Sequence, residues 1–212
     1  MFIINLGEMS MKLYYLPGAC SLASFISLLE AGVKFDYAPV DRATKKTPDG
    51  EDFMTVNPKG YVPALKLDNG EVLTENVALL AYIGDMNPGA KLIPAAGTME
   101  RFRVQEWLGY VSGEVHKNFG LLFNRAVPAD MKTIAKENLD KRLGFIEEQL
   151  GSKSYLTGEN FTVADAYLYV TLSWRKMMGV SIEKFPKLTA YFDRIVARPH
   201  VKAARKAEGL PE

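Results

Sequence analysis

The chain has 212 residues, of which 48% are apolar and 24% charged, and its formal net charge at pH 7 is +1. This composition is ordinary for a globular protein of one large or two small domains, and the charge argues against a nucleic-acid or membrane-surface partner. No apolar run reaches the roughly 20 residues that a membrane-spanning helix needs. The single cysteine excludes an internal disulfide. Residues 1–10 do not resemble a signal peptide, so we expect a cytoplasmic protein with an N-terminal extension over those residues.

The first half of the chain alternates short strands and helices. Residues 12–16 predict a strand, a helical apolar pattern follows until Gly32, and residues 35–40 predict a second strand. This order predicts a parallel βαβ unit with a right-handed crossover. Apolar residues 64–67 and 71–73 flank Asp68, Asn69 and Gly70, which predicts a hairpin with a tight primed turn. A helical pattern starts after the hairpin, at about Asn76.

The second half is predicted to be entirely helical. Prolines and glycines mark residues 89–97 as a linker between a domain at residues 11–88 and a domain at residues 98–212. One helix is expected to reach about Val115, and another runs from Met131 to Leu150. Thr162 and Asp165 have the spacing of a capping box that opens a third helix. Residues 188–196 give a further helical stripe.

Cys20 is the main candidate for chemistry because it lies between a predicted strand and a predicted helix. A helix N-terminus stabilises negative charge and therefore favours the thiolate. Ser21 can donate a hydrogen bond to that thiolate, and Tyr15 can offer a phenolic hydroxyl from the strand. The alternative is a buried, inert cysteine. His116 on a helix is usually solvated or satisfied, and the spacing of the two histidines and the cysteine does not match a metal site.

Several motifs occur together in a fixed order along the chain. They are MKLYYLPGACSL at 11–22, TKKT at 44–47, NPKGYVP at 57–63, LTE at 73–75, EWL at 106–108, EVHK at 114–117 and FTVADA at 161–166. From about Met11 onward the chain resembles a bacterial glutathione transferase, most closely of the beta class. The resemblance implies a thioredoxin-like domain of βαβαββα order followed by an all-helical domain. It also implies a homodimer.

The same resemblance implies glutathione as a co-substrate, without a permanently bound cofactor or a metal, and a small apolar electrophile as the second substrate. The catalytic candidates are then Cys20, Ser21, Tyr15 and His116. The implied glutathione contacts are Cys20, Lys45, Val62 before a cis Pro63, Glu75, Asn76, Arg101, Gly109, Gly113 and His116. The implied walls of the electrophile pocket are Tyr110, Phe119, Tyr167 and Trp174, for each of which core packing is an equal alternative.

Each implied contact has a specific role. The backbone of Val62 would pair with the cysteinyl unit of glutathione, and Lys45 with its glycyl carboxylate. Glu75 and the helix start at Asn76 would hold the γ-glutamyl end. Cys20 and His116 would reach the sulfur, and Arg101 would act across the dimer.

Two departures from the family pattern leave other functions open. Gly109 stands where the family commonly has Asn, and Gly113 where Ser is usual. A thiol-disulfide or peroxide reductase that uses Cys20 itself is one alternative to conjugation. A binding protein for apolar ligands or a protein partner, without catalysis, is the other, and the two glycines motivate it.

Overall fold

The computed structural model describes residues 11–211, so the predicted extension at residues 1–10 lies outside the described residues. The first half has the predicted βαβαββα order. Its elements are β1 (Lys12–Tyr15), α1 (Ser21–Ala31), β2 (Asp36–Pro39), α2 (Phe53–Val56), β3 (Ala64–Lys66), β4 (Val72–Thr74) and α3 (Asn76–Met86). Gly32 ends α1 in the left-handed conformation, at φ 67°, and its N–H binds the last carbonyls of the helix.

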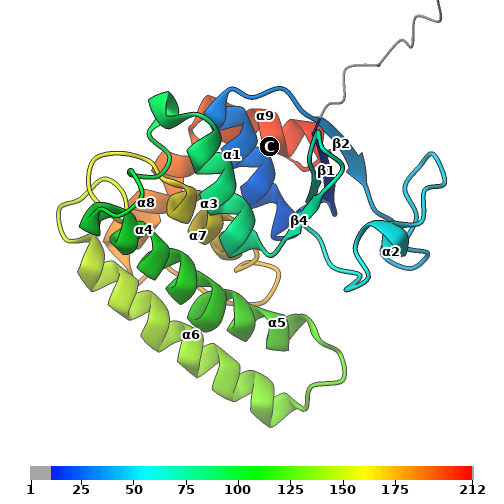
Figure 1. Cartoon of the computed structure of the whole chain (residues 1–212). Coiled ribbons are helices and arrows are strands. Elements are labelled where there is room, and N and C mark those ends of the chain that lie inside the picture. The colour runs from blue at the N-terminus through cyan, green and yellow to red at the C-terminus, as the bar shows by residue number, and fades with distance from the viewer. Residues whose placement is uncertain (1–10, 212) are drawn as a thin grey trace, which may run out of the picture.

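The four strands form one mixed sheet in the order β2-β1-β3-β4 (Figure 1). β1 is parallel to β2 and antiparallel to β3, and β3 is antiparallel to β4. Successive residues of a strand point to opposite faces. Leu13 therefore joins the large core with α1 and α3, whereas Tyr14 packs on Phe53 of α2 on the other face.

The hairpin between β3 and β4 differs from its prediction in the turn. Leu67 N–H donates to Glu71 O at 2.8 Å, and Gly70 N–H donates to Leu67 O at 2.9 Å. Asp68, Asn69 and Gly70 thus form a three-residue loop in which Gly70 alone has a positive φ, of 86°. The predicted two-residue primed turn is wrong, because a three-residue loop also places glycine in the left-handed position. The Asn-Gly signal located the hairpin without fixing its turn type.

The second half is helical, as predicted. Its elements are a short 3-10 helix η1 (Pro88–Ala90), α4 (Met99–Tyr110), a π-helical segment η2 (Val111–His116), α5 (Lys117–Phe123), α6 (Ala129–Leu150), α7 (Val163–Ser173), α8 (Pro186–Val196) and α9 (Pro199–Ala207). The segments α4, η2 and α5 continue one another, and α6 runs back alongside them (Figure 1).

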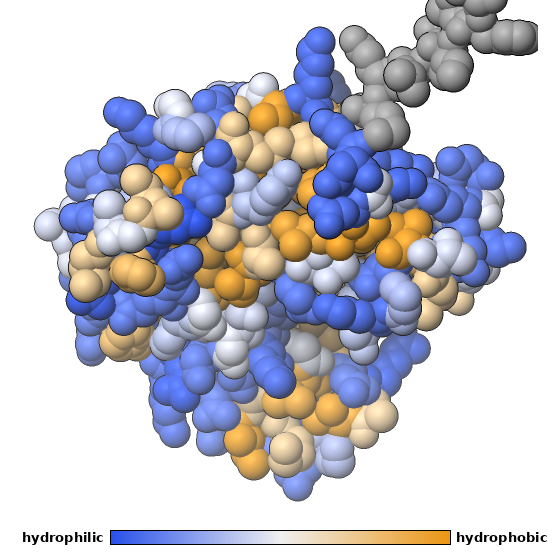
Figure 2. Space-filling view, viewed as in Figure 1, coloured by the Kyte–Doolittle hydropathy of each residue, from blue (hydrophilic) through white to orange (hydrophobic). Residues whose placement is uncertain are grey.

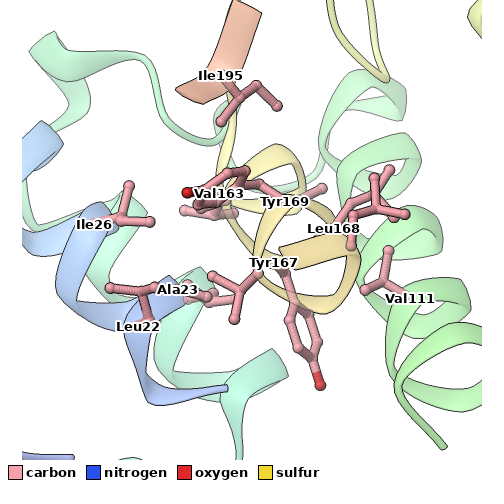
Figure 3. Close-up of a cluster of buried hydrophobic side chains, with 14 of the residues drawn as sticks. Leu22, Ala23, Ile26, Val111, Val163, Tyr167, Leu168, Tyr169 and Ile195 are labelled. Carbon is pink, nitrogen blue, oxygen red and sulfur yellow. The ribbon is translucent and has the colours of Figure 1, made fainter. Parts of the chain in front are cut away.

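The central helix of the second half is α7, whose residues from Val163 to Leu172 are all buried. It contacts α1 and α3 of the first half as well as α4 and α8 of its own. One apolar cluster therefore joins the two halves, with Leu22 and Ile26 of α1 on one side of α7 and Val111 of η2 on the other (Figure 3). Within residues 11–211, none of the helices combines the length and apolar character that crossing a bilayer requires.

Candidate active site

Cys20 is the N-cap residue of α1, in the turn that follows β1. Its thiol donates to the Val62 carbonyl oxygen, with Sγ and O 3.4 Å apart. Desolvation raises the pKa of Cys20 to about 12, although the backbone N–H groups of Cys20 and Ser21 act to lower it. The predicted lowering of this pKa by the helix N-terminus is therefore wrong in this structure. The free-energy cost of burying a thiolate exceeds the stabilisation that two backbone N–H groups give it.

The two predicted helpers of the thiol, Ser21 and Tyr15, are engaged elsewhere. Ser21 Oγ accepts from Leu16 N–H at 3.1 Å and donates to Leu16 O at 3.3 Å, so it closes the turn. Tyr15 is buried and packs edge to face on Phe25, with ring centroids 5.9 Å apart. Ser21 thus braces the turn that holds Cys20 and Tyr15 packs in the core, while their catalytic roles stay predictions.

Lys45 and Val62, the predicted partners of the glycyl and cysteinyl units of glutathione, lie beside and within residues 60–63. The Val62–Pro63 bond is cis, as the resemblance implied. Lys45 Nζ donates to the Gly60 carbonyl at 3.1 Å, two residues before the carbonyl that accepts the Cys20 thiol. The loop therefore brings a lysine ammonium and the Cys20 sulfur to the same short segment.

Glu75, just before α3, is paired with a residue that the sequence analysis overlooked. Lys59 Nζ lies 2.7 Å from Glu75 Oε1 and also donates to Thr74 Oγ1 at 3.0 Å. Both charged side chains are exposed. An ammonium and a carboxylate side by side at a helix N-terminus complement the zwitterionic end of an amino acid. The only sequence signal for Lys59 was its place in the motif at 57–63.

Asn76, the first residue of α3, is buried and ties α3 to α1. Its Nδ2 donates to the Cys20 carbonyl at 2.8 Å, and its Oδ1 accepts from Ser24 Oγ at 2.8 Å. The side chain thus orients the turn of Cys20. A direct contact of the α3 N-terminus with glutathione stays a prediction.

His116 comes from the helical half, at the end of η2. Single turns of π-helix within α-helices frequently occur at functional sites. His116 Nδ1 lies 2.7 Å from the Tyr167 hydroxyl, and the His116 ring packs on Trp174 with centroids 5.0 Å apart. Desolvation lowers the pKa of His116, so its imidazole is neutral at neutral pH.

Trp174 connects this histidine to the turn of Cys20. Its indole N–H donates to the Gly18 carbonyl at 2.7 Å. Its ring also contacts Phe119 and Phe123 edge to face, at 5.8 and 5.4 Å. Phe119 is fully buried and belongs to the core, whereas Phe123 is half-buried, so Phe123 is the better candidate for a pocket wall.

Two predicted site residues belong to other parts of the molecule. Tyr110 packs between Trp107 and Phe145 and donates to a backbone carbonyl of α6; the three aromatic residues line a separate cavity of about 470 Å³. Arg101 is buried, and its guanidinium binds Asp85 through two hydrogen bonds of 2.7 and 2.8 Å. Arg101 thus links α4 to α3 within its own chain, and the predicted site roles of Tyr110 and Arg101 stay predictions.

Two family models match the chain. The glutathione S-transferase N-terminal domain matches residues 19–86, and the glutathione S-transferase C-terminal domain matches residues 107–199. The chain belongs to the glutathione S-transferase family. It is 41% identical over 200 residues to glutathione S-transferase GstA of Escherichia coli O157:H7, a match that covers 94% of this chain and 100% of that protein.

Solved bacterial glutathione S-transferases share the fold closely. A Sphingomonad enzyme complexed with glutathione has a TM-score of 0.90 and 46% identity, over 94% of this chain and 100% of that one. A beta-class enzyme of Sphingomonas chungbukensis has a TM-score of 0.90 and 47% identity, with the same coverage. The predicted family, fold class and use of glutathione as co-substrate are thereby confirmed. The domain boundaries at residues 88 and 98 stay predictions.

This glutathione S-transferase contains a carboxylate near Cys20 that the sequence did not indicate. Glu208, just after α9, is buried, and its Oε2 accepts from Gly18 N–H at 2.8 Å. Trp174 holds the carbonyl of the same residue, so the helical domain binds Gly18 at both of its peptide groups. The turn that carries Cys20 is therefore fixed from the C-terminal half of the chain.

Two helix glycines of this glutathione S-transferase, Gly109 and Gly113, have room for a side chain. Among the described residues, nothing lies within 4 Å of a Cβ built at Gly109, which is exposed on α4. Gly109→Ala is expected to raise the free energy of unfolding by about 0.5–1 kcal/mol, because alanine restricts the unfolded chain and favours the helix. Urea denaturation measures this change.

A matched control comes from another helical glycine. A Cβ at Gly84 in α3 would lie 2.6 Å from Ile93 Cγ2, so Gly84→Ala is expected to destabilise the protein. If Gly109→Ala also destabilised the protein, the space at Gly109 would have to be occupied by something other than the described residues.

Proposed function

We propose that this protein conjugates the glutathione thiolate to small, mostly apolar electrophiles. The observation that carries the proposal is the thiol of Cys20 at the start of α1, hydrogen-bonded to Val62 O beside the cis Pro63. Membership of the glutathione S-transferase family and the likeness to an enzyme solved with glutathione support it.

Glutathione binds along residues 59–63 and the start of α3. The backbone of Val62 pairs with the cysteinyl unit, which directs the glutathione sulfur toward Cys20. Lys45 attracts the glycyl carboxylate. The pair of Lys59 and Glu75 meets the γ-glutamyl end, with Glu75 on its amino group and Lys59 on its carboxylate.

The pKa of Cys20 decides which sulfur carries the negative charge. An ordinary cysteine thiol, such as that of glutathione, has a pKa of about 8.5. Burial raises the pKa of Cys20 to about 12. Of two neighbouring thiols, the one with the lower pKa ionises first, so glutathione becomes the thiolate and Cys20 S–H donates to it. The bound anion is stabilised and held beside the electrophile.

The electrophile is held by aromatic side chains. His116, Phe123 and Trp174 form a cluster beside the turn of Cys20. Such walls accept flat, apolar compounds without a specific polar contact. This composition supports a broad class of small apolar electrophiles over a single charged substrate.

A reductase that uses Cys20 directly is the second candidate, and the position of Cys20 beside the glutathione segment favours it. In that reaction the Cys20 thiolate attacks the glutathione sulfur of a disulfide between glutathione and a substrate thiol. The attack forms a mixed disulfide of Cys20 with glutathione and releases the substrate thiol. A second glutathione thiolate then releases glutathione disulfide and restores Cys20. The raised pKa of Cys20 weighs against this route, because the thiolate is its nucleophile.

Cys20→Ser and Cys20→Ala separate the two candidates. If Cys20 acts as a hydrogen-bond donor, Cys20→Ala should lower kcat/KM for conjugation of a chloronitrobenzene about tenfold, the effect of losing one hydrogen bond to a charged group. Cys20→Ser keeps a donor and should stay within about threefold of the wild type. Both variants should lose disulfide reduction and any glutathione adduct seen by mass spectrometry.

Other outcomes identify the other functions. Equal loss of conjugation in both variants would make Cys20 the nucleophile. Failure of the wild type to bind millimolar glutathione in calorimetry would leave the non-catalytic binding protein, which the glycines at Gly109 and Gly113 motivated.

A cytoplasmic homodimer is also part of the proposal. Tyr82 of α3 and Met99 and Phe102 of α4 are exposed apolar residues. Figure 2 shows apolar residues gathered over α3 and beside β4 on this face. A second copy that packs on this face would cover them, and Arg101, held by Asp85, would stay with its own chain.

A further inference from the structure

Tyr167 is the polar member of the apolar cluster that joins the two halves of the protein. Its side chain is 2% exposed and lies between Leu22 and Ala23 of α1 and Val111 of η2, with the hydroxyl directed out of the cluster (Figure 3). A buried hydroxyl is costly unless it has a hydrogen-bond partner. The partner of Tyr167 is Nδ1 of His116, 2.7 Å away, so a residue predicted as a pocket wall instead binds the histidine of the site.

The hydroxyl lies where the two domains meet. Its neighbours include the side chains of Ser112 in η2 and Asn76 in α3, and it is coupled electrostatically to the thiol of Cys20. Asn76 in turn binds the Cys20 carbonyl. The hydrogen bond between His116 and Tyr167 therefore lies beside the side chain that holds the turn of Cys20.

The protonation states of the two side chains allow either to donate, and the phenol, the more acidic of the two, is the better donor. Burial raises the pKa of Tyr167 above its ordinary value, so the phenol keeps its proton at every working pH. Burial lowers the pKa of His116, so the imidazole is neutral and has one donor nitrogen and one acceptor nitrogen. A phenol that donates to Nδ1 leaves the ring proton on Nε2.

We propose that Tyr167 is a positioning residue that holds His116 in the Nε2–H tautomer, so that this ring nitrogen donates to the glutathione sulfur. The proposal rests on the proposed glutathione site. His116 and Cys20 then supply two hydrogen bonds to one thiolate from two domains, and Tyr167 acts only through His116.

The tautomer can be measured without any substrate. The chain has two histidines, so His200→Gln assigns the ring signals of His116 in a long-range proton–nitrogen NMR spectrum. Wild-type His116 should show a protonated Nε2 and an unprotonated Nδ1. Tyr167→Phe should give a mixture of tautomers and raise the pKa of His116, because the hydrogen bond that favours its neutral form is lost.

Kinetics provide the second readout. Tyr167→Phe should lower kcat for conjugation about tenfold, with KM for glutathione within twofold, and should cause no further loss in a His116→Ala background. The matched control is Tyr169→Phe. Tyr169 is a buried tyrosine of the same helix whose hydroxyl contacts Arg205 instead, so its kcat should stay within twofold.

Three results would overturn the proposal. They are a protonated Nδ1 in the wild type, equal kinetics for Tyr167→Phe and Tyr169→Phe, and additive losses with His116→Ala. If the wild type neither bound nor conjugated glutathione, the proposed function would fail on its own, whereas the NMR measurement would still report whether Tyr167 sets the tautomer.

Discussion

Asp165→Ala is expected to lower the free energy of unfolding by about 4 kcal/mol, because it removes a buried carboxylate and leaves buried donors unpaired. Asp165 is fully buried near the start of α7. Its Oδ1 accepts from Leu156 N–H and the Tyr191 hydroxyl, and its Oδ2 accepts from the Thr162 N–H and hydroxyl, at 2.8 to 2.9 Å. One side chain thus caps α7, fixes the preceding loop and binds α8.

The loss should appear as a lower midpoint in urea and a melting temperature lower by about 8–16 °C, from about 2–4 °C per kcal/mol in a chain of this size. Asp140→Ala is the control, because Asp140 pairs with Lys184 at an exposed site of α6 and should cost less than about 1 kcal/mol. A loss for Asp165→Ala no larger than that of the control would contradict the role of Asp165.

Glu208→Gln is expected to stabilise the protein at pH 9 by on the order of 3 kcal/mol and to leave its stability at pH 4 nearly unchanged. Burial raises the pKa of Glu208 from 4.5 to about 7. One of its carboxyl oxygens accepts from Gly18 N–H, and within residues 11–211 the other has no hydrogen-bond partner. The charge of Arg205 acts on Glu208, and the charge of Glu208 in turn acts on the ionisable groups of Tyr15 and Cys20.

The change of the unfolding free energy with pH depends on the difference in proton binding between the folded and unfolded states. A carboxyl whose pKa is higher in the folded state binds its proton more tightly when folded, so its stabilising effect is complete below pH 4.5 and is lost as the pH rises to about 7. Each pKa unit corresponds to about 1.4 kcal/mol. Glutamine resembles the neutral acid and keeps an acceptor for Gly18 N–H. Because glutamine does not ionise, the variant does not lose stability as the pH rises.

Denaturation of both proteins from pH 4 to 9 measures this difference. Glu148→Gln, at an exposed position of α6, removes the same charge and should give a constant difference from the wild type across the range. If the Glu208→Gln curve ran parallel to the wild-type curve, Glu208 would have the same pKa in the folded and unfolded states.

Local sequence signals determined the elements of this protein and their order. Gly32 marked the end of α1 because a left-handed cap favours glycine, and Thr162 with Asp165 marked the start of α7 through a pattern of four residues. Both depend on neighbours in the chain. The motifs from residue 11 to residue 166 located the glutathione segment in the same way, and Cys20 is found at a helix start as predicted.

Only the tertiary structure decided the chemistry of that site. The sequence predicted a lowered pKa for Cys20 from the helix N-terminus, but burial by distant segments outweighs that local effect. Tyr167 meets His116 across 51 residues of chain, and Trp174 and Glu208 meet Gly18 across 156 and 190. Such contacts have no local sequence pattern, because the packing of α7 and α9 against the first domain creates them. The sequence by itself thus determined which residue types surround the sulfur, and the packing of the two domains decided which of them carry a proton.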